Sequence, residues 1–392
     1  MKKLMILGAG IYQVPLIKKA KEMGLYTIVV SIPGKYPGFQ LADKVYYENT
    51  VDYDKILKIA ENEKIDGIMT AGTDVAVITI GYVCDKLCLK GLSRSAAEQA
   101  TNKMLMKKSF EIEGVRTARF REVHFNKNEI INETKELKFP LIFKAVDTSG
   151  SRGIIKVNNS NDFKNAMEYV HAATKLDYFI IEEFLVGDEF GAQAYVQDGK
   201  VEFILPHGDY VFTCETGVPV GHYAPFELNE EIINDIKEQL SKAVKALGLN
   251  NCAINADFIL ADNKPYVLEI GGRSGATCLA ELTSIYYDFD YYEKMIRVSL
   301  GEKVDFYSNK TIPNASKLIK SDKDGIIIDQ GIQGNIKENV VEIQFDYEKG
   351  DYIKKFKVGP DRIGHVITKG KTLKEASQTL EETVNQIYVN VE

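Results

Sequence analysis

The hydrophobic pattern of the first hundred residues alternates between short apolar runs and amphipathic stretches. The apolar runs at 3–7, 26–31 and 65–70 predict strands, and the stretches at 14–23 and 53–63 predict helices. Strands that alternate with helices through short turns imply a parallel sheet with helices on both faces. Ligands of such sheets bind at the carboxyl ends of the strands.

The pattern changes after about residue 97, where longer and paired strands predominate. The runs at 178–184, 189–197 and 200–205 predict strands, and Asp198-Gly199 predicts a hairpin between the last two. A long amphipathic stretch at 229–247 then predicts a helix, which ends at Gly248.

The last part of the chain, from about residue 301, is β-rich and carries one closing helix near 372–388. We therefore expect a mixed α/β and α+β protein. Its 392 residues suggest two or three domains, and the changes of pattern divide them into 1–96, 97–305 and 306–392.

Composition narrows the classes of partner. Lys and Arg number 49 against 56 Asp and Glu, for a formal charge of −7, and no long block of one sign is present. Nucleic acid rewards clustered basic residues, so no nucleic-acid partner is expected. The apolar run before Gly8 is too short for a secretion signal, and nothing reaches the ~18 apolar residues that cross a bilayer. We expect a cytoplasmic chain with no membrane partner.

Five cysteines are present, and only Cys84 and Cys88 are close in sequence. Their spacing of four places both on one face of a predicted helix, which favours a small apolar core role. A metal site would need further Cys or His nearby.

The turn Gly8-Ala9-Gly10 follows a strand and precedes a helix. A dinucleotide fingerprint would need a third glycine at position 13, where the chain has Gln13, so no NAD is inferred. The turn either lets an anion approach a helix N-terminus or simply connects strand and helix.

Residues 139–144 predict a buried strand that carries Lys144, followed by a small-residue loop at 147–153. Such a loop can wrap phosphates with its backbone N–H groups while the lysine supplies charge. In isolation, a mobile hairpin with an exposed lysine explains the segment equally well. The loop candidates for phosphate binding are Ser149, Gly150, Ser151 and Gly153.

A second apolar strand ends in the acidic segment Glu182-Glu183-Phe184-Leu185, and Glu189 follows. The strand end can present main-chain groups to an adenine edge, and the later carboxylate can hold a ribose diol. Alone, the segment is only an acidic strand end.

The third element is a predicted strand pair that makes Asp257 and Glu269 neighbours. Two adjacent carboxylates repel each other unless a cation lies between them, and Mg²⁺ with ATP phosphates suits oxygen ligands. Two solvated carboxylates on a sheet face are the alternative. That alternative explains poorly the glycine-rich segment 271–275 around Arg273, which suits close approach of an anion.

Taken together, these motifs resemble the ATP-grasp superfamily, over nearly the whole chain and in the same order. The layout is similar to that of L-amino acid ligases, biotin carboxylase, glycinamide ribonucleotide synthetase and formate-dependent glycinamide ribonucleotide transformylase. The resemblance implies a doubly wound domain at 1–96 before the ATP-grasp domain. It also implies an ATP-grasp domain at 97–305 with a mobile lid near 115–185, and a C-terminal domain at 306–392.

The resemblance also implies roles for single residues. Lys103 and Lys144 match the phosphate-binding lysines. Asp257 and Glu269 match the ligands of one or two Mg²⁺ ions, and Arg273 the arginine that steadies the substrate carboxylate. Gly271 replaces the asparagine that many members carry, which Asn255 or water would have to compensate. The nucleotide base and ribose would be bound by Glu182, Glu183, Phe184, Leu185 and Glu189.

The implied activity is that of an ATP-dependent, ADP-forming ligase, with Lys144 and Arg273 as catalytic residues. A carboxylate is activated as an acyl phosphate, an amine attacks it, and lid closure excludes water. Small-molecule carboxylates and amines are the implied partners, and family habit suggests a homodimer.

Substrate identity is less constrained. The segment 206–225 is dense in His, Gly and Pro, which predicts a binding loop that includes His207, His222, Cys214 and Glu215. Each histidine could equally be an ordinary loop residue that makes one hydrogen bond. Asp74 either binds a substrate amine or caps the next helix. The substrate-pocket candidates are Thr73, Asp74, His207, Arg273, Ser274 and Gly275.

Three functions stay open at this point. The leading one is an amino-acid or peptide-like carboxylate–amine ligase. The second is a purine-pathway type of ligase, or a carboxylase, that acts on a ribonucleotide and would need a basic phosphate cradle in the first domain. The third is a non-catalytic nucleotide-binding module, against which the retained lysines and carboxylates argue.

Overall fold

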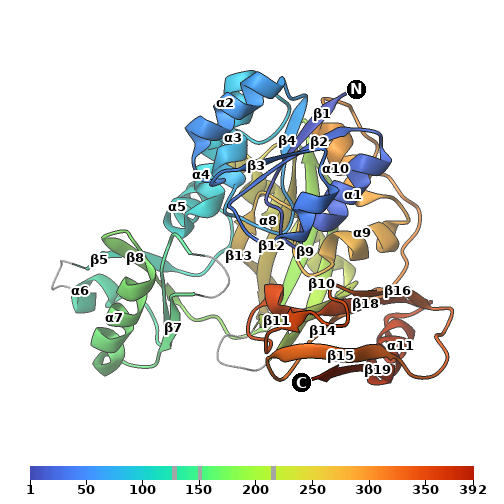
Figure 1. The fold of residues 1–392 in the computed structure, drawn as a ribbon. Coiled ribbons are helices and arrows are strands. Elements are labelled where there is room, and N and C mark those ends of the chain that lie inside the picture. The colour runs from blue at the N-terminus through green and yellow to red at the C-terminus, as the bar shows by residue number, and fades with distance from the viewer. Residues whose placement is uncertain (126–129, 149–151, 213–217) are drawn as a thin grey trace.

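The computed structural model describes residues 1–125, 130–148, 152–212 and 218–392. Ser149, Gly150 and Ser151, and likewise Cys214 and Glu215, lie outside the described residues. Figure 1 shows an upper α/β part, a small lid set apart at the left, and a long central sheet that runs into the C-terminal strands.

The N-terminal sheet is parallel, with strand order β3-β2-β1-β4, as the hydrophobic pattern predicts. The residues from Leu4 to Leu7 of β1 are fully buried because helices cover both faces. Its elements are β1 (Lys3–Leu7), α1 (Val14–Glu22), β2 (Tyr26–Ser31), β3 (Lys44–Tyr47), α2 (Tyr53–Glu63), β4 (Gly67–Met69) and α3 (Val77–Leu87).

A helical connection leads into the lid, whose four strands form an antiparallel sheet in the order β5-β8-β6-β7. The lid has its own apolar core around Phe143 and Phe179. Connection and lid comprise α4 (Arg94–Thr101), α5 (Lys103–Glu113), β5 (Phe120–His124), α6 (Ile130–Thr134), β6 (Leu141–Lys144), β7 (Ile154–Val157), α7 (Phe163–Ala173) and β8 (Tyr178–Glu183).

The central sheet has eight strands in the order β13-β12-β9-β10-β11-β14-β18-β16. It continues across the predicted boundary near residue 305, because β11 pairs antiparallel with β14. The predicted long helix is present as α8, with Asn229 as its N-cap and Gly248 as its left-handed C-cap. The first half comprises β9 (Asp188–Gln197), β10 (Lys200–Phe212), β11 (Val218–Ala224), α8 (Glu230–Leu247), β12 (Cys252–Ala261) and β13 (Lys264–Gly271).

The C-terminal part adds strands to this sheet and builds a second sheet in the order β17-β15-β19. It is β-rich with one late helix, as expected. Its elements, with the two helices before them, are α9 (Leu279–Tyr287), α10 (Tyr291–Ser299), β14 (Asn314–Ile319), β15 (Gly325–Ile332), β16 (Val340–Phe345), β17 (Tyr352–Ile353), β18 (Gly364–Lys369), α11 (Leu373–Gln386) and β19 (Ile387–Val391).

The predicted binding loop at 206–225 is wrong in the part that the structure describes, where β10 and β11 occupy residues up to 212 and from 218. Gly208 makes room for an aromatic ring inside the strand, because a Cβ there would lie 2.0 Å from the Tyr223 ring. On the neighbouring β9, a Cβ on Gly191 would lie 2.2 Å from the His207 ring. His207 and His222 are therefore strand residues.

The cysteine prediction holds for one of the two residues. Cys84 is buried in the core, whereas Cys88 is exposed as the left-handed C-cap that ends α3. Among the described residues, none of the helices is both long and apolar enough to cross a membrane.

Candidate functional site

One face of the central sheet carries a polar row that crosses four strands. Glu269 on β13 is opposite Asp257 on β12, Asp257 is opposite Gly191 on β9, and Gly191 is opposite His207 on β10. Residues directly opposite on antiparallel strands point to the same face. The register therefore brings the predicted metal carboxylates and His207 together, although 62 residues separate Glu269 from His207 (269 − 207).

The carboxylate pair has the electrostatic properties of a cation site. Desolvation by the surrounding protein raises the pKa of Asp257 to about 7, although its side chain is exposed to solvent, and the charge of Glu269 adds to the rise. A divalent cation between the two would favour the ionised form, because an opposite charge nearby lowers a carboxyl pKa. Carboxylate oxygens beside phosphate oxygens are the ligands that Mg²⁺ takes in nucleotide sites, so the donor set fits this ion.

Lys103 joins this pair to the lid. It is the first residue of α5, where the Asn102 side chain accepts from the N–H groups of Met104 and Leu105. Its Nζ lies 3.2 Å from Glu269 Oε1 and donates to the Thr148 carbonyl at 2.6 Å. Thr148 lies near the start of the small-residue loop at 147–153. The predicted phosphate lysine, the loop entrance and the metal carboxylates therefore converge.

Lys144 lies in a buried charge cluster with Glu182 and Lys107. Glu182 Oε2 is 3.0 Å from Lys144 Nζ and 3.3 Å from Lys107 Nζ. Burial raises the pKa of Glu182, but the two lysines outweigh it and leave the pKa below its usual value. Burial lowers the pKa of Lys107 to about 8.

Sequence reasoning missed Lys107. The signal was its spacing of four from Lys103, which places both on one face of α5. The negative charge of Glu269 partly opposes the lowering of the Lys107 pKa by burial. The cluster around Glu182 and the carboxylate pair therefore lie within electrostatic reach of each other.

The end of β8 fits an adenine ring. Glu182 Oε1 is buried and has no hydrogen-bond partner among the described residues, so an acceptor awaits a donor such as an adenine amino group. The Glu183 side chain is occupied, because its Oε1 accepts from the Lys138 N–H at 2.9 Å and lies 3.3 Å from Arg119. The Glu183 N–H donates to the Arg119 carbonyl at 2.9 Å, so the predicted contact with the nucleotide would have to use the Glu183 carbonyl.

The remaining nucleotide candidates surround this strand end. The N–H of Phe184 donates to the Pro140 carbonyl at 2.9 Å, Leu185 follows β8, and Glu189 is exposed at the start of β9. Gly153 has a φ of +66°, and a Cβ there would lie 2.7 Å from Ala173. Position 153, where the loop ends and β7 begins, therefore requires glycine.

Arg273 reaches the N-terminal domain. Its Nε and Nη2 each donate at 2.8 Å to one carboxylate oxygen of Asp74, across 199 positions of sequence. Asp74 does not cap α3, whose N-cap is Ala76 without a side-chain hydrogen bond. Instead, Asp74 and the preceding Thr73 place the N-terminal domain beside the arginine, and the bidentate pair fixes the guanidinium plane.

Ser274 and Gly275 border the same face. The Ser274 hydroxyl is buried and has no hydrogen-bond partner among the described residues. The Gly275 N–H donates at 2.9 Å to Gln193 Oε1, and a Cβ on this glycine would lie 2.4 Å from Leu279. The backbone at Gly275 therefore packs closely against the sheet near the polar row.

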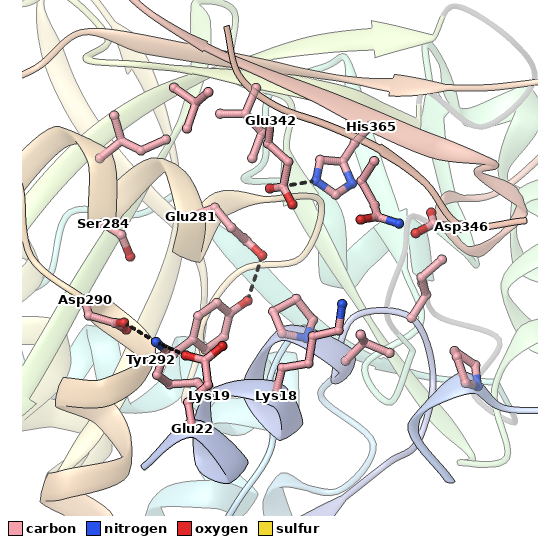
Figure 2. A pocket seen from close by; sticks show the side chains of 18 of the residues that line it. Lys18, Lys19, Glu22, Glu281, Ser284, Asp290, Tyr292, Glu342, Asp346 and His365 are labelled. Atoms are coloured by element: carbon pink, nitrogen blue, oxygen red, sulfur yellow. Dashed lines mark hydrogen bonds and ion pairs between the residues drawn. The ribbon is translucent and has the colours of Figure 1, made fainter. Parts of the chain in front are cut away.

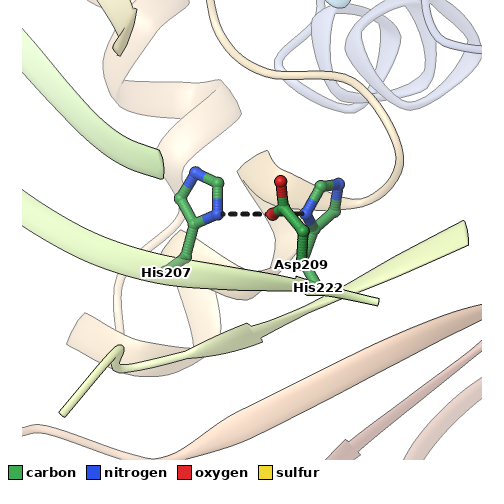
Figure 3. Close-up of side chains that lie close together, drawn as sticks. All are labelled: His207, Asp209 and His222. Atoms are coloured by element: carbon green, nitrogen blue, oxygen red, sulfur yellow. Dashed lines mark hydrogen bonds and ion pairs between the residues drawn. The ribbon is translucent and has the colours of Figure 1, made fainter. Parts of the chain in front are cut away.

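His207 and His222 flank Asp209 at the other end of the row (Figure 3). Asp209 Oδ1 lies 3.2 Å from His207 Nδ1 and 2.6 Å from His222 Nδ1. Burial raises the pKa of Asp209, but the histidines hold it well below its usual range. The three residues also satisfy the spacing of a metal-binding group, with ligand atoms within 4.8 Å of one another.

A separate cavity of about 920 Å³ lies between α1, α9 and the C-terminal strands (Figure 2). None of the site residues above lines it. Its basic side chains are largely paired: Lys19 with Glu22 and Asp290, and Arg362 with Asp346 at 3.0 Å. The cavity is thus mixed in charge and distinct from the cleft.

Comparison with known proteins agrees with this geometry. The family described as the ATP-grasp domain matches residues 137–281, and the L-amino acid ligase C-terminal domain 2 matches residues 336–392. A solved structure titled phosphoribosylglycinamide synthetase from Anaerococcus prevotii is 37% identical, with a TM-score of 0.88 over 100% of both chains.

Two further relatives carry amino-acid ligase names. The solved L-amino acid ligase from Bacillus licheniformis shares the fold, at 18% identity and a TM-score of 0.81 over 100% of this chain and 99% of that one. Alanine–anticapsin ligase of Bacillus subtilis is 28% identical over 60% of this chain and 55% of its own length. The chain spans between 34% and 55% of the length of four curated relatives. By its identity and full-length overlap with the Anaerococcus protein, the chain belongs to the ATP-grasp family of ligases.

Proposed function

We propose that this chain is an ADP-forming ligase that activates a small-molecule carboxylate as an acyl phosphate and couples it to an amine. The observation that carries the proposal is the convergence in one cleft of two lysine clusters with a carboxylate pair. Lys103 contacts Glu269 directly, and Lys107 links Glu269 electrostatically to Glu182 and Lys144. A triphosphate with its magnesium needs such a distribution of charge.

Each residue has a distinct task in this proposal. Lys103 and Lys144 bind the phosphates and offset the charge that develops as the carboxylate attacks in line. Asp257 and Glu269 hold one or two Mg²⁺ ions, which neutralise phosphate charge when bound. Arg273 orients the carboxylate and donates hydrogen bonds to the oxyanion that forms when the amine attacks. Its pairing with Asp74 keeps the guanidinium in place for both steps.

For the substrate, we favour an amino acid or a peptide-like carboxylate. The support is the match of residues 336–392 to a domain named for L-amino acid ligases, together with the alanine–anticapsin relative.

A ribonucleotide is the second candidate, because the Anaerococcus relative is titled as a phosphoribosylglycinamide synthetase. A ribonucleotide phosphate needs unpaired basic side chains. In the cavity of Figure 2, Lys19 and Arg362 are already paired with carboxylates, which leaves Lys18 as the lining lysine without an ion pair among the described residues. We therefore rank this substrate class second, with a carboxylase reaction in the same group.

We further propose a cytoplasmic enzyme, a homodimer as in related ligases, and a lid near 115–185 that closes over the nucleotide. Closure would exclude water, which otherwise hydrolyses the acyl phosphate.

The test is a coupled assay for ADP and phosphate release across amino acids, dipeptides and ribonucleotides, with product analysis by mass spectrometry. Amino-acid-dependent ADP release with a new amide supports the proposal. Turnover with a ribonucleotide alone favours the second candidate. ATP binding without any product from any pair would favour a non-catalytic module.

A further inference from the structure

Two imidazoles share one carboxylate oxygen at the end of the polar row (Figure 3). His207 and Asp209 are two apart on β10, and Asp209 is directly opposite His222 on β11. Strand side chains alternate between faces, so all three lie on the face that carries Asp257 and Glu269. The geometry leaves two readings, a metal site or a pair of oriented histidines.

The protonation of His207 separates these readings. Gln193 Oε1 accepts the Gly275 N–H at 2.9 Å, which directs Gln193 Nε2 toward Asn255 Oδ1 at 2.6 Å and toward His207 Nε2 at 3.4 Å. An amide N–H can meet only the lone pair of an imidazole nitrogen. The ring proton of His207 is therefore on Nδ1, where it is donated to Asp209. A metal on Nδ1 would instead force an N–H against the amide N–H, so the network favours oriented histidines.

His222 is oriented in the same way, and its second nitrogen has no hydrogen bond among the residues that the structure describes. Its Nδ1–H donates to Asp209 at 2.6 Å, and Figure 3 shows its Nε2 directed away from that carboxylate. Across the strand pair, His222 is opposite Ser316 on β14. The Ser316 hydroxyl is buried and without a hydrogen-bond partner among the described residues. His222 and Ser316 are both buried, and the His222 lone pair and the unpartnered hydroxyl lie on the sheet face that carries the polar row.

We infer that His222 Nε2 is the base that takes the proton from the ammonium group of the amine substrate, with Asp209 as the residue that positions it. The inference rests on the proposed ligase function. An ammonium group has no lone pair and cannot attack, so it must first lose a proton. The proton passes to His222 Nε2, the amine nitrogen forms a bond to the acyl carbon, and the C–O bond to phosphate breaks with its electron pair on phosphate. The second nitrogen proton leaves with the departing phosphate.

The charged groups around His222 are consistent with this role. On the same face are Asp209 and His207 from β10, Asp257 from β12 and Glu269 from β13, all described above. From α9, which packs on β11, Glu281 is engaged by the Tyr292 hydroxyl at 3.1 Å. The carboxylates attract an ammonium ion, and Asp209 stabilises the imidazolium that forms.

The test compares two nucleophiles in the His222→Asn variant. Asparagine keeps a donor for Asp209 and removes the Nε2 lone pair. An α-ammonium group, with a pKa of about 8, needs a base at neutral pH, whereas hydroxylamine is already a neutral nucleophile. We expect amide formation at pH 7 to fall by about tenfold or more in this variant, because only about a tenth of an amine with that pKa is neutral at this pH, while hydroxamate formation falls by less than about threefold. Raising the pH toward the pKa of the amine should restore part of the lost amide formation. His171→Asn, at an exposed position of the lid helix α7, is the matched control and should change neither rate.

Equal loss of amide and hydroxamate, or loss of neither, would overturn the inference. So would a transition metal that purifies with the wild-type chain and is missing from His222→Asn, since the metal reading would then hold. If the wild-type chain makes no hydroxamate from any carboxylate, the ligase proposal itself fails, and the inference with it.

Discussion

The buried cluster of Lys107, Lys144 and Glu182 makes the clearest quantitative prediction. Glu182 Oε2 contacts both lysines, at 3.3 Å and 3.0 Å, and all three side chains are buried or nearly so. At an effective dielectric constant of about 20, charges 3.3 Å apart interact by about 5 kcal/mol, which desolvation largely offsets. The net effect of one lysine is therefore a few kcal/mol.

We predict that Lys107→Met lowers the free energy of unfolding by about 1–3 kcal/mol, below the 3–5 kcal/mol of a broken buried pair because Lys144 still faces Glu182. Glu182→Gln leaves two buried lysine charges close together and should cost about 3–5 kcal/mol. The double variant should be more stable than the sum of the single effects predicts, with a coupling energy of about 1–3 kcal/mol.

Urea unfolding at constant m-value measures these differences. Lys107→Met should also raise the KM for ATP, because Glu182 then has only Lys144 as its counter-ion. Lys144 would stay paired with Glu182 when the phosphates of ATP arrive. Single effects that add within about 0.5 kcal/mol, with an unchanged KM for ATP, would refute the reasoning.

Three further predictions concern the cleft. Glu269→Gln should abolish ATP turnover, which here means a fall of about 10²-fold or more, while the thermal unfolding temperature is unchanged. Substantial residual turnover would contradict the assignment of Glu269 as a metal ligand. Because the pKa of Asp257 is raised to about 7, the chain without metal should lose stability as the pH rises from about 4, the pKa of an unfolded aspartate, to about 7. The loss should be smaller than the full shift implies, because the Asp257 side chain is exposed to solvent, and Mg²⁺ should recover that stability. Nucleotide binding should then depend on Mg²⁺ more strongly near pH 8 than near pH 6, as calorimetry would show, and equal dependence would count against the shift. Arg273→Lys keeps the charge but loses the two-pronged pairing with Asp74, so kcat should fall by about 10–100-fold with little change in the KM for ATP; loss of ATP binding instead would place Arg273 at the nucleotide.

Local sequence patterns predict much of the fold. The strand Tyr26–Ser31 and the helix Tyr53–Glu63 have the predicted bounds, because burial on one face and capping at the ends act over a few residues. The loop predicted at 206–225 failed because glycine there serves ring packing between strands, which local sequence does not encode. The N-terminal parallel sheet was foreseen, whereas pairing of β11 with β14 depends on residues almost a hundred positions apart.

The site divides in the same way. Asp257 and Glu269 were predictable as partners because a tight turn joins their strands. Lys107 was not, because a lysine in a helix usually faces water, and only tertiary packing brings Glu182 to it. The pairing of Arg273 with Asp74 spans two domains, and no pattern within either segment specifies it.

The central claim is that one magnesium–nucleotide cleft passes phosphate to a substrate carboxylate. The most direct measurement follows oxygen-18 from a labelled carboxylate substrate, identified by the ADP-release survey, into the products. The account predicts that one labelled oxygen appears in inorganic phosphate, because the acyl phosphate bridge retains a carboxylate oxygen. Label found in AMP, or phosphate released without label, would contradict it.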